Sequence, residues 1–129
     1  EAGLVFDEKL TRCGDVIDEV GYRYTQELIR EGADFTAIFA FSDEMAIGAI
    51  NALYDNGLRV PEDISVLGFD DLPIAMRIRP ALTTIHQPLH EIVSRTLDVF
   101  TDQNLNMANM AITLPHTVCE RATCRRINE

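Results

Sequence analysis

The sequence predicts an α/β domain in which a parallel β-sheet is flanked by helices. Residues 35–41 and 64–69 are almost unbroken apolar runs, which is typical of parallel strands that are covered on both faces. Residues 43–56 lie between them and have the apolar spacing of an amphipathic helix. This order predicts two neighbouring parallel strands joined by a right-handed helical crossover.

A helix is expected before this unit, at residues 15–31, because its apolar side chains recur on one stripe. Acidic residues lie near its start, Arg30 lies near its end, and Gly32 follows as a stop signal. Residues 1–14 resemble the end of an earlier helix, with Gly3 just past it. We therefore expect the sequence to begin within a domain.

The helix at residues 43–56 has clear boundary signals. Ser42 is a good N-cap, because its hydroxyl accepts a hydrogen bond from a free backbone N–H. Asp43 and Glu44 suit the positive end of the helix dipole, and Asn56 with Gly57 ends the helix. Its buried face is predicted to consist of Ala46, Ala49, Ile50 and Leu53. Ile47 lies off this stripe, which indicates a second covered face.

The second half of the chain alternates between short strands and helices. The predicted elements are a short helix from Pro73, a strand at 82–85, a helix opened by Pro88, a polar loop at 102–110, and strand segments at 111–114 and 117–124 separated by Pro115.

Length, charge and cysteine content limit the possible functions. The chain has 129 residues, which fits one domain, and a formal net charge of -10. Only Arg125 and Arg126 adjoin one another among the basic residues, so this segment alone is not expected to bind DNA. No apolar run is long enough to span a membrane, and the first residues do not form a signal peptide.

Three cysteines without a CxxC motif favour a reducing compartment over a disulfide framework. Cys119 and Cys124 with His116 match no standard zinc spacing. We therefore expect neither a metal nor a cofactor.

The candidate site lies where the two predicted parallel strands end. Ser42 follows the first strand and Asp70 follows the second. Neighbouring strands lie about 4.8 Å apart. In open α/β sheets, ligands bind outside the carboxyl ends of the strands. The two side chains are therefore predicted to meet at one edge of the sheet and to bind a small polar molecule. Alternatively, Asp70 caps the following short helix.

Three segments together resemble the C-terminal part of the effector-binding domain of lactose-repressor-type (LacI/GalR) transcription regulators. They are AIFAFSDEMAIGAINAL at 37–53, GLRVPEDISVLGFDD at 57–71 and ALTTIHQPLHEI at 81–92. The order and spacing fit from about Gly14 through Cys124. The resemblance implies a fold like that of periplasmic sugar-binding proteins, with two α/β lobes and a ligand cleft between them.

The resemblance also implies site residues. Ser42 stands where the family usually has an Asn that hydrogen-bonds the ligand, and Asp70 matches an Asp that binds ligand hydroxyls or ring nitrogens. Val16 lies where the family often has a stacking aromatic residue. Gln87 and Leu89 match positions that line the cleft. The departures at Ser42 and Val16 predict a ligand different from the family's best-known sugars.

The resemblance further implies homodimerisation through this lobe. The matching residues are Ile47, Ile50, Tyr54, Ile74 and Ile78. By the same resemblance, residues 1–85 and 116–129 belong to the C-terminal lobe and residues 86–115 to the other lobe. Most of that other lobe and the DNA-binding domain lie outside this sequence, so we expect an incomplete lobe and a fragment of a longer regulator.

The expected function is the effector-sensing and dimerisation part of a cytoplasmic transcriptional repressor. A sugar or nucleoside-like effector would control DNA binding allosterically, and the segment would have no enzymatic activity. A periplasmic sugar-binding protein of a transporter is one alternative. A small α/β hydrolase or phosphatase that uses Asp70 and Asp71 is another, but neither a third catalytic partner nor a metal cluster is evident.

Overall fold

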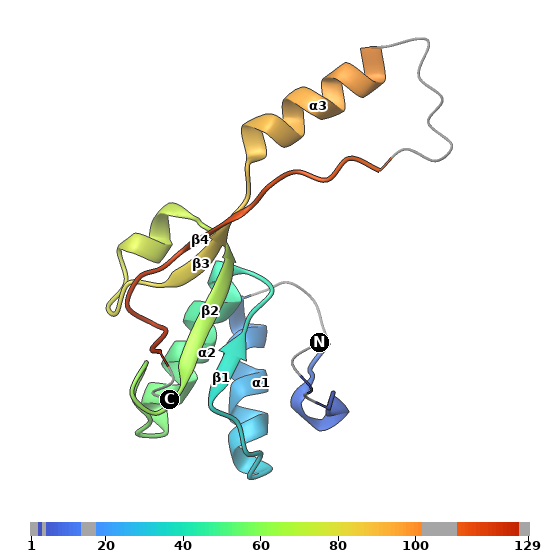
Figure 1. Ribbon diagram of the computed structural model, residues 1–129. Coiled ribbons are helices and arrows are strands. Elements are labelled where there is room, and N and C mark those ends of the chain that lie inside the picture. The colour runs from blue at the N-terminus through green and yellow to red at the C-terminus, as the bar shows by residue number, and fades with distance from the viewer. Residues whose placement is uncertain (1–2, 4, 14–17, 102–110, 127–129) are drawn as a thin grey trace.

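The computed structural model describes residues 3, 5–13, 18–101 and 111–126. A four-stranded sheet forms its centre, with the strands in the order β1 to β4 (Figure 1). The strands are β1 (Ala37–Phe39), β2 (Ser65–Asp70), β3 (Thr83–His86) and β4 (Thr117–Cys119). The first three are parallel to one another, and β4 is antiparallel to β3. The predicted α/β class and parallel sheet are confirmed.

The helices α1 (Asp18–Arg30) and α2 (Asp43–Asp55) pack against each other, and α2 also packs on β2. Gly21 allows the close approach of the two helices, because a Cβ atom there would lie 2.1 Å from the Met45 carbonyl oxygen. The face predicted for α2 lies in the core, where Ala46 and Leu53 are fully buried. Ser42 caps this helix as predicted, since its Oγ accepts a hydrogen bond of 3.2 Å from Met45 N.

Strand β1 is shorter than the predicted 35–41, and it lies at the edge of the sheet. Phe39 and Phe41 are 61% and 69% exposed, so the expectation of a strand covered on both faces is wrong for β1. Both rings instead contact Phe69 of β2, at centroid distances of 6.5 and 6.3 Å. An edge strand has a neighbouring strand on one side only, and both rings remain mostly exposed.

The predicted strand at 111–114 does not form, and the predicted strand at 117–124 shrinks to β4. Register explains the first difference, because Thr117 pairs with His86, the last residue of β3. Residues that precede Thr117 run past the end of the sheet, where no strand is available to share backbone hydrogen bonds (Figure 1).

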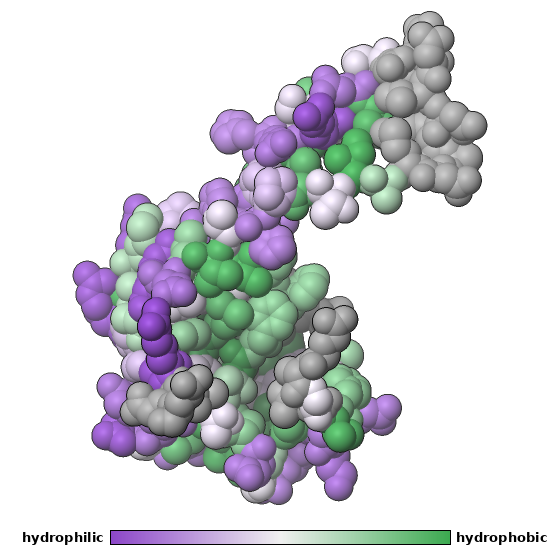
Figure 2. Space-filling model, in the orientation of Figure 1, coloured by the Kyte–Doolittle hydropathy of each residue, from purple (hydrophilic) through white to green (hydrophobic). Residues whose placement is uncertain are grey.

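Helix α3 (Leu89–Thr101) begins after Pro88, as predicted, and extends away from the sheet (Figure 1). It has no buried residue, and Leu89, Val93 and Leu97 of its apolar stripe are each 58% exposed. Figure 2 shows hydrophobic and hydrophilic side chains together at the surface of this arm. In the described ranges there are also two short 3-10 helices, η1 (Glu8–Leu10) and η2 (Pro73–Met76), the second at the predicted Pro73.

In the described part of the chain, no helix has the length and apolar character needed to cross a membrane.

Candidate functional site

The candidate site lies at the carboxyl ends of β1, β2 and β3, where Ser42, Asp70 and Gln87 come to the same edge of the sheet. Because Phe39 pairs with Leu67, the residues that follow β1 run beside the end of β2. Phe41 stacks on Phe69 there. The convergence that the sequence predicted is therefore present, and ligand binding by these residues stays a prediction.

Asp70 is held by Gln87 rather than by a helix. Its Oδ1 accepts a hydrogen bond of 2.6 Å from Gln87 Nε2. The alternative role, as the cap of the next short helix, is wrong, because Leu72 occupies the N-cap position of η2 and no side chain caps it. Asp70 has a backbone φ of 113°, which residues with a Cβ rarely adopt. Such conformations cluster at ligand sites.

Asp71 has different partners from Asp70 and faces β3 and β4. Its Oδ1 accepts from Arg121 Nη2 at 2.5 Å, and its Oδ2 lies 3.0 Å from His86 Nδ1 and 3.5 Å from Cys119 Sγ. Burial alone would raise the pKa of Asp71, but hydrogen bonds from Arg121 and His86 outweigh it, so the pKa lies below its ordinary value. Asp71 therefore forms a partly buried ion pair, and the two carboxylates do not form an acid–base dyad.

Ser42 is only 6% exposed, and its oxygen already accepts the capping hydrogen bond from Met45 N. Any contact with a ligand would use the hydroxyl proton or the second lone pair of this oxygen, and only a small part of the side chain. Leu89 is 58% exposed at the start of α3. Val16 lies outside the described residues.

Asp43 is the site residue whose burial sequence reasoning missed. Its carboxylate is 0% exposed, and it accepts a hydrogen bond from the Thr84 hydroxyl and another, of 2.7 Å, from Leu72 N. Burial raises the pKa of Asp43, and the neighbouring Asp70 and Asp71 raise it further against the lowering effect of both hydrogen bonds. Gly68 could have indicated this burial, because a glycine inside a strand often marks a place where another group approaches the backbone closely.

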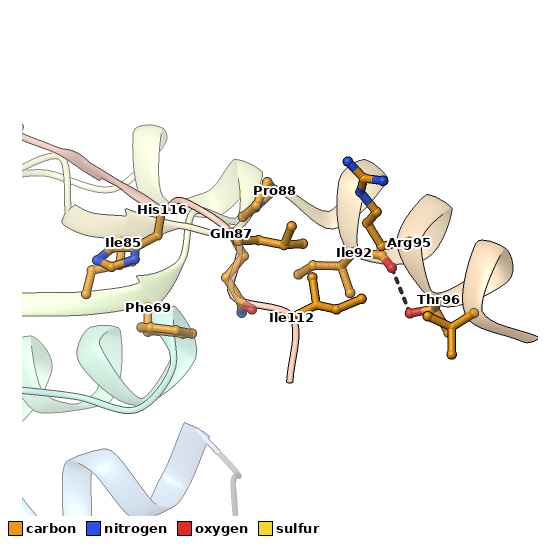
Figure 3. Close-up of a pocket in the computed structure, with 11 residues that line it drawn as sticks. Phe69, Ile85, Gln87, Pro88, Ile92, Arg95, Thr96, Ile112 and His116 are labelled. Atoms are coloured by element: carbon orange, nitrogen blue, oxygen red, sulfur yellow. Dashed lines mark hydrogen bonds between the residues drawn. The ribbon is translucent and has the colours of Figure 1, made fainter. Parts of the chain in front are cut away.

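A cavity of about 540 Å³ adjoins Gln87, between the sheet and α3 (Figure 3). Figure 3 shows Phe69 and Ile85 on the sheet side and Ile92 facing Ile112 on the arm side. The lining is mostly apolar with a few polar groups, as is typical of small-molecule sites. The lining residues are Phe69, Ile85, Gln87, Pro88, Ile92, Arg95, Thr96, Val99, Ile112, Leu114 and His116.

Sequence reasoning found Gln87 but not the rest of this lining, and Pro88 and Ile92 line the cavity where Leu89 was expected. Across the described ranges, no group of three His, Cys, Asp or Glu side chains is arranged to hold a metal ion.

The predicted dimer residues differ in exposure. Tyr54 and Ile74 are 42% and 40% exposed, and Ile47 and Ile78 are half-buried. Ile50 is 3% exposed and belongs to the core, so its side chain is not available for a partner, and its assignment to the interface was wrong. It lies on the same helical stripe as Ala46 and Leu53, which face the sheet.

Comparison with known proteins identifies the family. Residues 5–124 match the family described as the periplasmic binding protein-like domain. A transcriptional repressor named PurR from Erwinia tasmaniensis is 42% identical over 103 residues, which is 80% of this chain and 30% of that protein. The chain therefore spans less than half of this curated relative, which is named as a transcriptional regulator and not as an enzyme.

Solved structures agree with this result. A sugar-binding transcriptional regulator of the LacI family from Escherichia coli, complexed with phosphate, superposes with a TM-score of 0.82 at 32% identity, over 94% of this chain and 44% of that one. The lac repressor dimer bound to operator and an anti-inducer superposes with a TM-score of 0.74 at 34% identity, over 86% and 39%. The chain thus belongs to the periplasmic binding protein-like domain family and is similar to LacI-type transcriptional regulators.

Proposed function

We propose that this chain is the effector-sensing and dimerisation part of a transcriptional repressor. The observation that carries the proposal is the Asp70–Gln87 pair, which lies at the carboxyl ends of parallel strands. This is where open α/β sheets bind ligands. Gln87 also lines the cavity of about 540 Å³, whereas Asp70 contacts that lining through Gln87. In this proposal Asp70 binds the effector, Asp71 pairs with Arg121, and the chain carries out no chemistry of its own.

The site chemistry favours a sugar or a nucleoside-like effector. The Asp70 carboxylate accepts hydrogen bonds and the Gln87 amide both donates and accepts them, which suits hydroxyl groups and ring nitrogens. Phe69 and Ile85 provide apolar surface for the flat or carbon face of a ring. A related solved structure is described as sugar-binding.

Residues 86–115 are assigned to a second lobe in this proposal. Helix α3 carries exposed apolar side chains and extends away from the sheet, as expected of a segment that packs with another part of a longer protein (Figure 1). An effector bound between two lobes changes their relative orientation only if it binds one arrangement better than the other.

DNA binding is assigned to an N-terminal domain of the longer regulator, since the present chain has a net charge of -10. A homodimer would form through Ile47, Tyr54, Ile74 and Ile78. Three free cysteines fit a cytoplasmic protein.

Thermal shift measurements with a panel of sugars and nucleosides on the full-length regulator test this function. An effector at a hundredfold excess over its dissociation constant stabilises the folded protein by about 2.7 kcal/mol and raises the melting temperature. Asp70→Ala should abolish the shift, whereas the control Asp34→Ala, in the exposed loop before β1, should retain it. A panel that leaves the wild-type melting temperature unchanged, or an Asp70→Ala variant that responds normally, contradicts the proposal.

A further inference from the structure

Asp43 is a fully buried carboxylate whose two hydrogen-bond partners are both neutral. Thr84 donates its hydroxyl to Oδ1, and Leu72 donates its backbone N–H to Oδ2. Burial of a carboxylate without a cationic partner lowers stability unless hydrogen bonds compensate for lost hydration. Helix capping does not require it here, because Ser42 already caps α2. The position of this side chain therefore indicates a role beyond the helix start.

Space for this carboxylate exists because residue 68, in the interior of β2, is glycine. A Cβ atom at Gly68 would lie 2.4 Å from Asp43 Oδ1 and 3.3 Å from Thr84 Oγ1. Gly68 is paired in register with Thr84, so the glycine and the hydroxyl donor lie side by side beneath the carboxylate. Glycine inside a strand is itself unfavourable. The buried Asp43 carboxylate and the strand glycine Gly68, each unfavourable on its own, thus lie next to each other.

The backbone that Asp43 holds is the turn that presents Asp70. Asp70 and Asp71 have φ values of 113° and 57°, and the next residue, Leu72, donates its N–H to Asp43. Residues with a Cβ rarely adopt such φ values unless surrounding contacts impose them. Fixing the N–H of Leu72 restrains the exit of this turn, and the Asp70 carboxylate is then directed toward Gln87.

We propose that Asp43 is a positioning residue, which holds the 70–72 turn so that the carboxylate of Asp70 faces Gln87 and the effector. The effector part of this statement rests on the proposed function. The hydrogen bond between Asp70 and Gln87 joins two residues of the chain itself, so the positioning is measured separately from effector binding.

The test is an NMR measurement of the Gln87 side-chain amide in the ¹⁵N-labelled 129-residue chain. The signal is assigned by its loss in Gln87→Leu, and the Asp70→Ala variant defines its position without the hydrogen bond. Asp43→Asn should shift the Gln87 amide signal toward that position, because the asparagine side chain has one acceptor oxygen for two donors. The matched control is Asp63→Asn, which removes a carboxylate that accepts its hydrogen bonds from Arg59, and it should leave the signal in place.

A second pair of variants retains the carboxylate. Thr84→Val removes one donor and should produce a smaller shift in the same direction, and Thr84→Ser keeps the hydroxyl and should restore the wild-type signal. This rescue separates positioning from general loss of packing. If Asp43→Asn does not fold, the two Thr84 variants still test the proposal.

A Gln87 signal that stays at its wild-type position in folded Asp43→Asn, or in Thr84→Val, overturns the proposal. An unchanged signal in Asp70→Ala overturns it as well, because the bond that Asp43 is said to orient would then be absent in solution. The absence of any binding sugar or nucleoside would remove the proposed function instead, and the amide result would still stand for Asp43 as the residue that positions Asp70.

Discussion

Gln87 Nε2 donates a hydrogen bond of 2.6 Å to Asp70 Oδ1, and so links the residue after β3 to the last residue of β2. The pair lies where the sheet ends and the chain turns toward α3. A molecule that binds Oδ1 of Asp70 must share or replace this hydrogen bond, and one that binds Oδ2 lies beside it. A change in the hydrogen bonding of Asp70 would therefore reach Gln87, which lies two residues before the start of α3.

The Asp71–Arg121 ion pair predicts how stability depends on acid. The pKa of Asp71 is lowered in the folded state, so the unfolded chain binds more protons as the pH falls below about 4. The stabilisation is fully present above the unfolded pKa and is lost as the pH falls through the folded pKa. The free energy of unfolding should be measured with urea from about pH 2.5 to about pH 7, a range that includes the titration of carboxyl groups. Asp71→Asn should lose part of the acid dependence that the wild type shows.

Asp63 provides the internal control for that measurement. Its hydrogen bonds with Arg59 lower its pKa to about 2, so Asp71→Asn should retain the part of the acid dependence that belongs to Asp63. Arg121→Leu should lower the free energy of unfolding at neutral pH by about 3 kcal/mol, because a partly buried carboxylate then loses its guanidinium partner and keeps His86 and Cys119. Equal acid dependence in wild type and Asp71→Asn would contradict the assignment.

Leu53 and Leu97 give opposite predictions for the same substitution. Leu53 is fully buried on the core face of α2, and Leu53→Ala should lower the free energy of unfolding by about 2–5 kcal/mol. Leu97 is 58% exposed on α3, and Leu97→Ala should change it by less than about 0.5 kcal/mol in the 129-residue chain. In the full-length regulator, Leu97→Ala should cost about 2 kcal/mol if a second lobe covers α3. An equally small effect in both proteins would argue against that lobe assignment.

The proposed dimer surface is tested best at Ile74, which is 40% exposed on η2 and outside the core. Ile74→Glu should raise the dimer dissociation constant by at least about tenfold, since burying an unpaired charge in an interface costs more than about 1.4 kcal/mol. Val118→Glu is the matched control, because Val118 is 54% exposed on β4 and outside the proposed surface. Sedimentation velocity that shows the same self-association for both variants would place the interface elsewhere.

Local sequence signals predicted most elements of the fold, because they act over a few residues. The Ser42 cap, the apolar stripe of α2 and the proline at the start of η2 each appear in the structure where the sequence indicated. The same signals failed at 111–114 and at the faces of β1. A strand needs a neighbouring strand to share its backbone hydrogen bonds and other segments to bury its side chains. The residues of the strand alone do not show whether either is present.

The sequence by itself determined that Ser42 and Asp70 would follow successive strands, and the rule for open α/β sheets then brought them to one edge. Gln87 was indicated only by the family resemblance. Only the tertiary structure decided which carboxylate faces which partner. Asp71 is held by Arg121, 50 positions later, and Asp43 by Thr84, 41 positions later. Neither partner is visible from local spacing, because burial and hydrogen bonding depend on segments that become neighbours only when the sheet assembles.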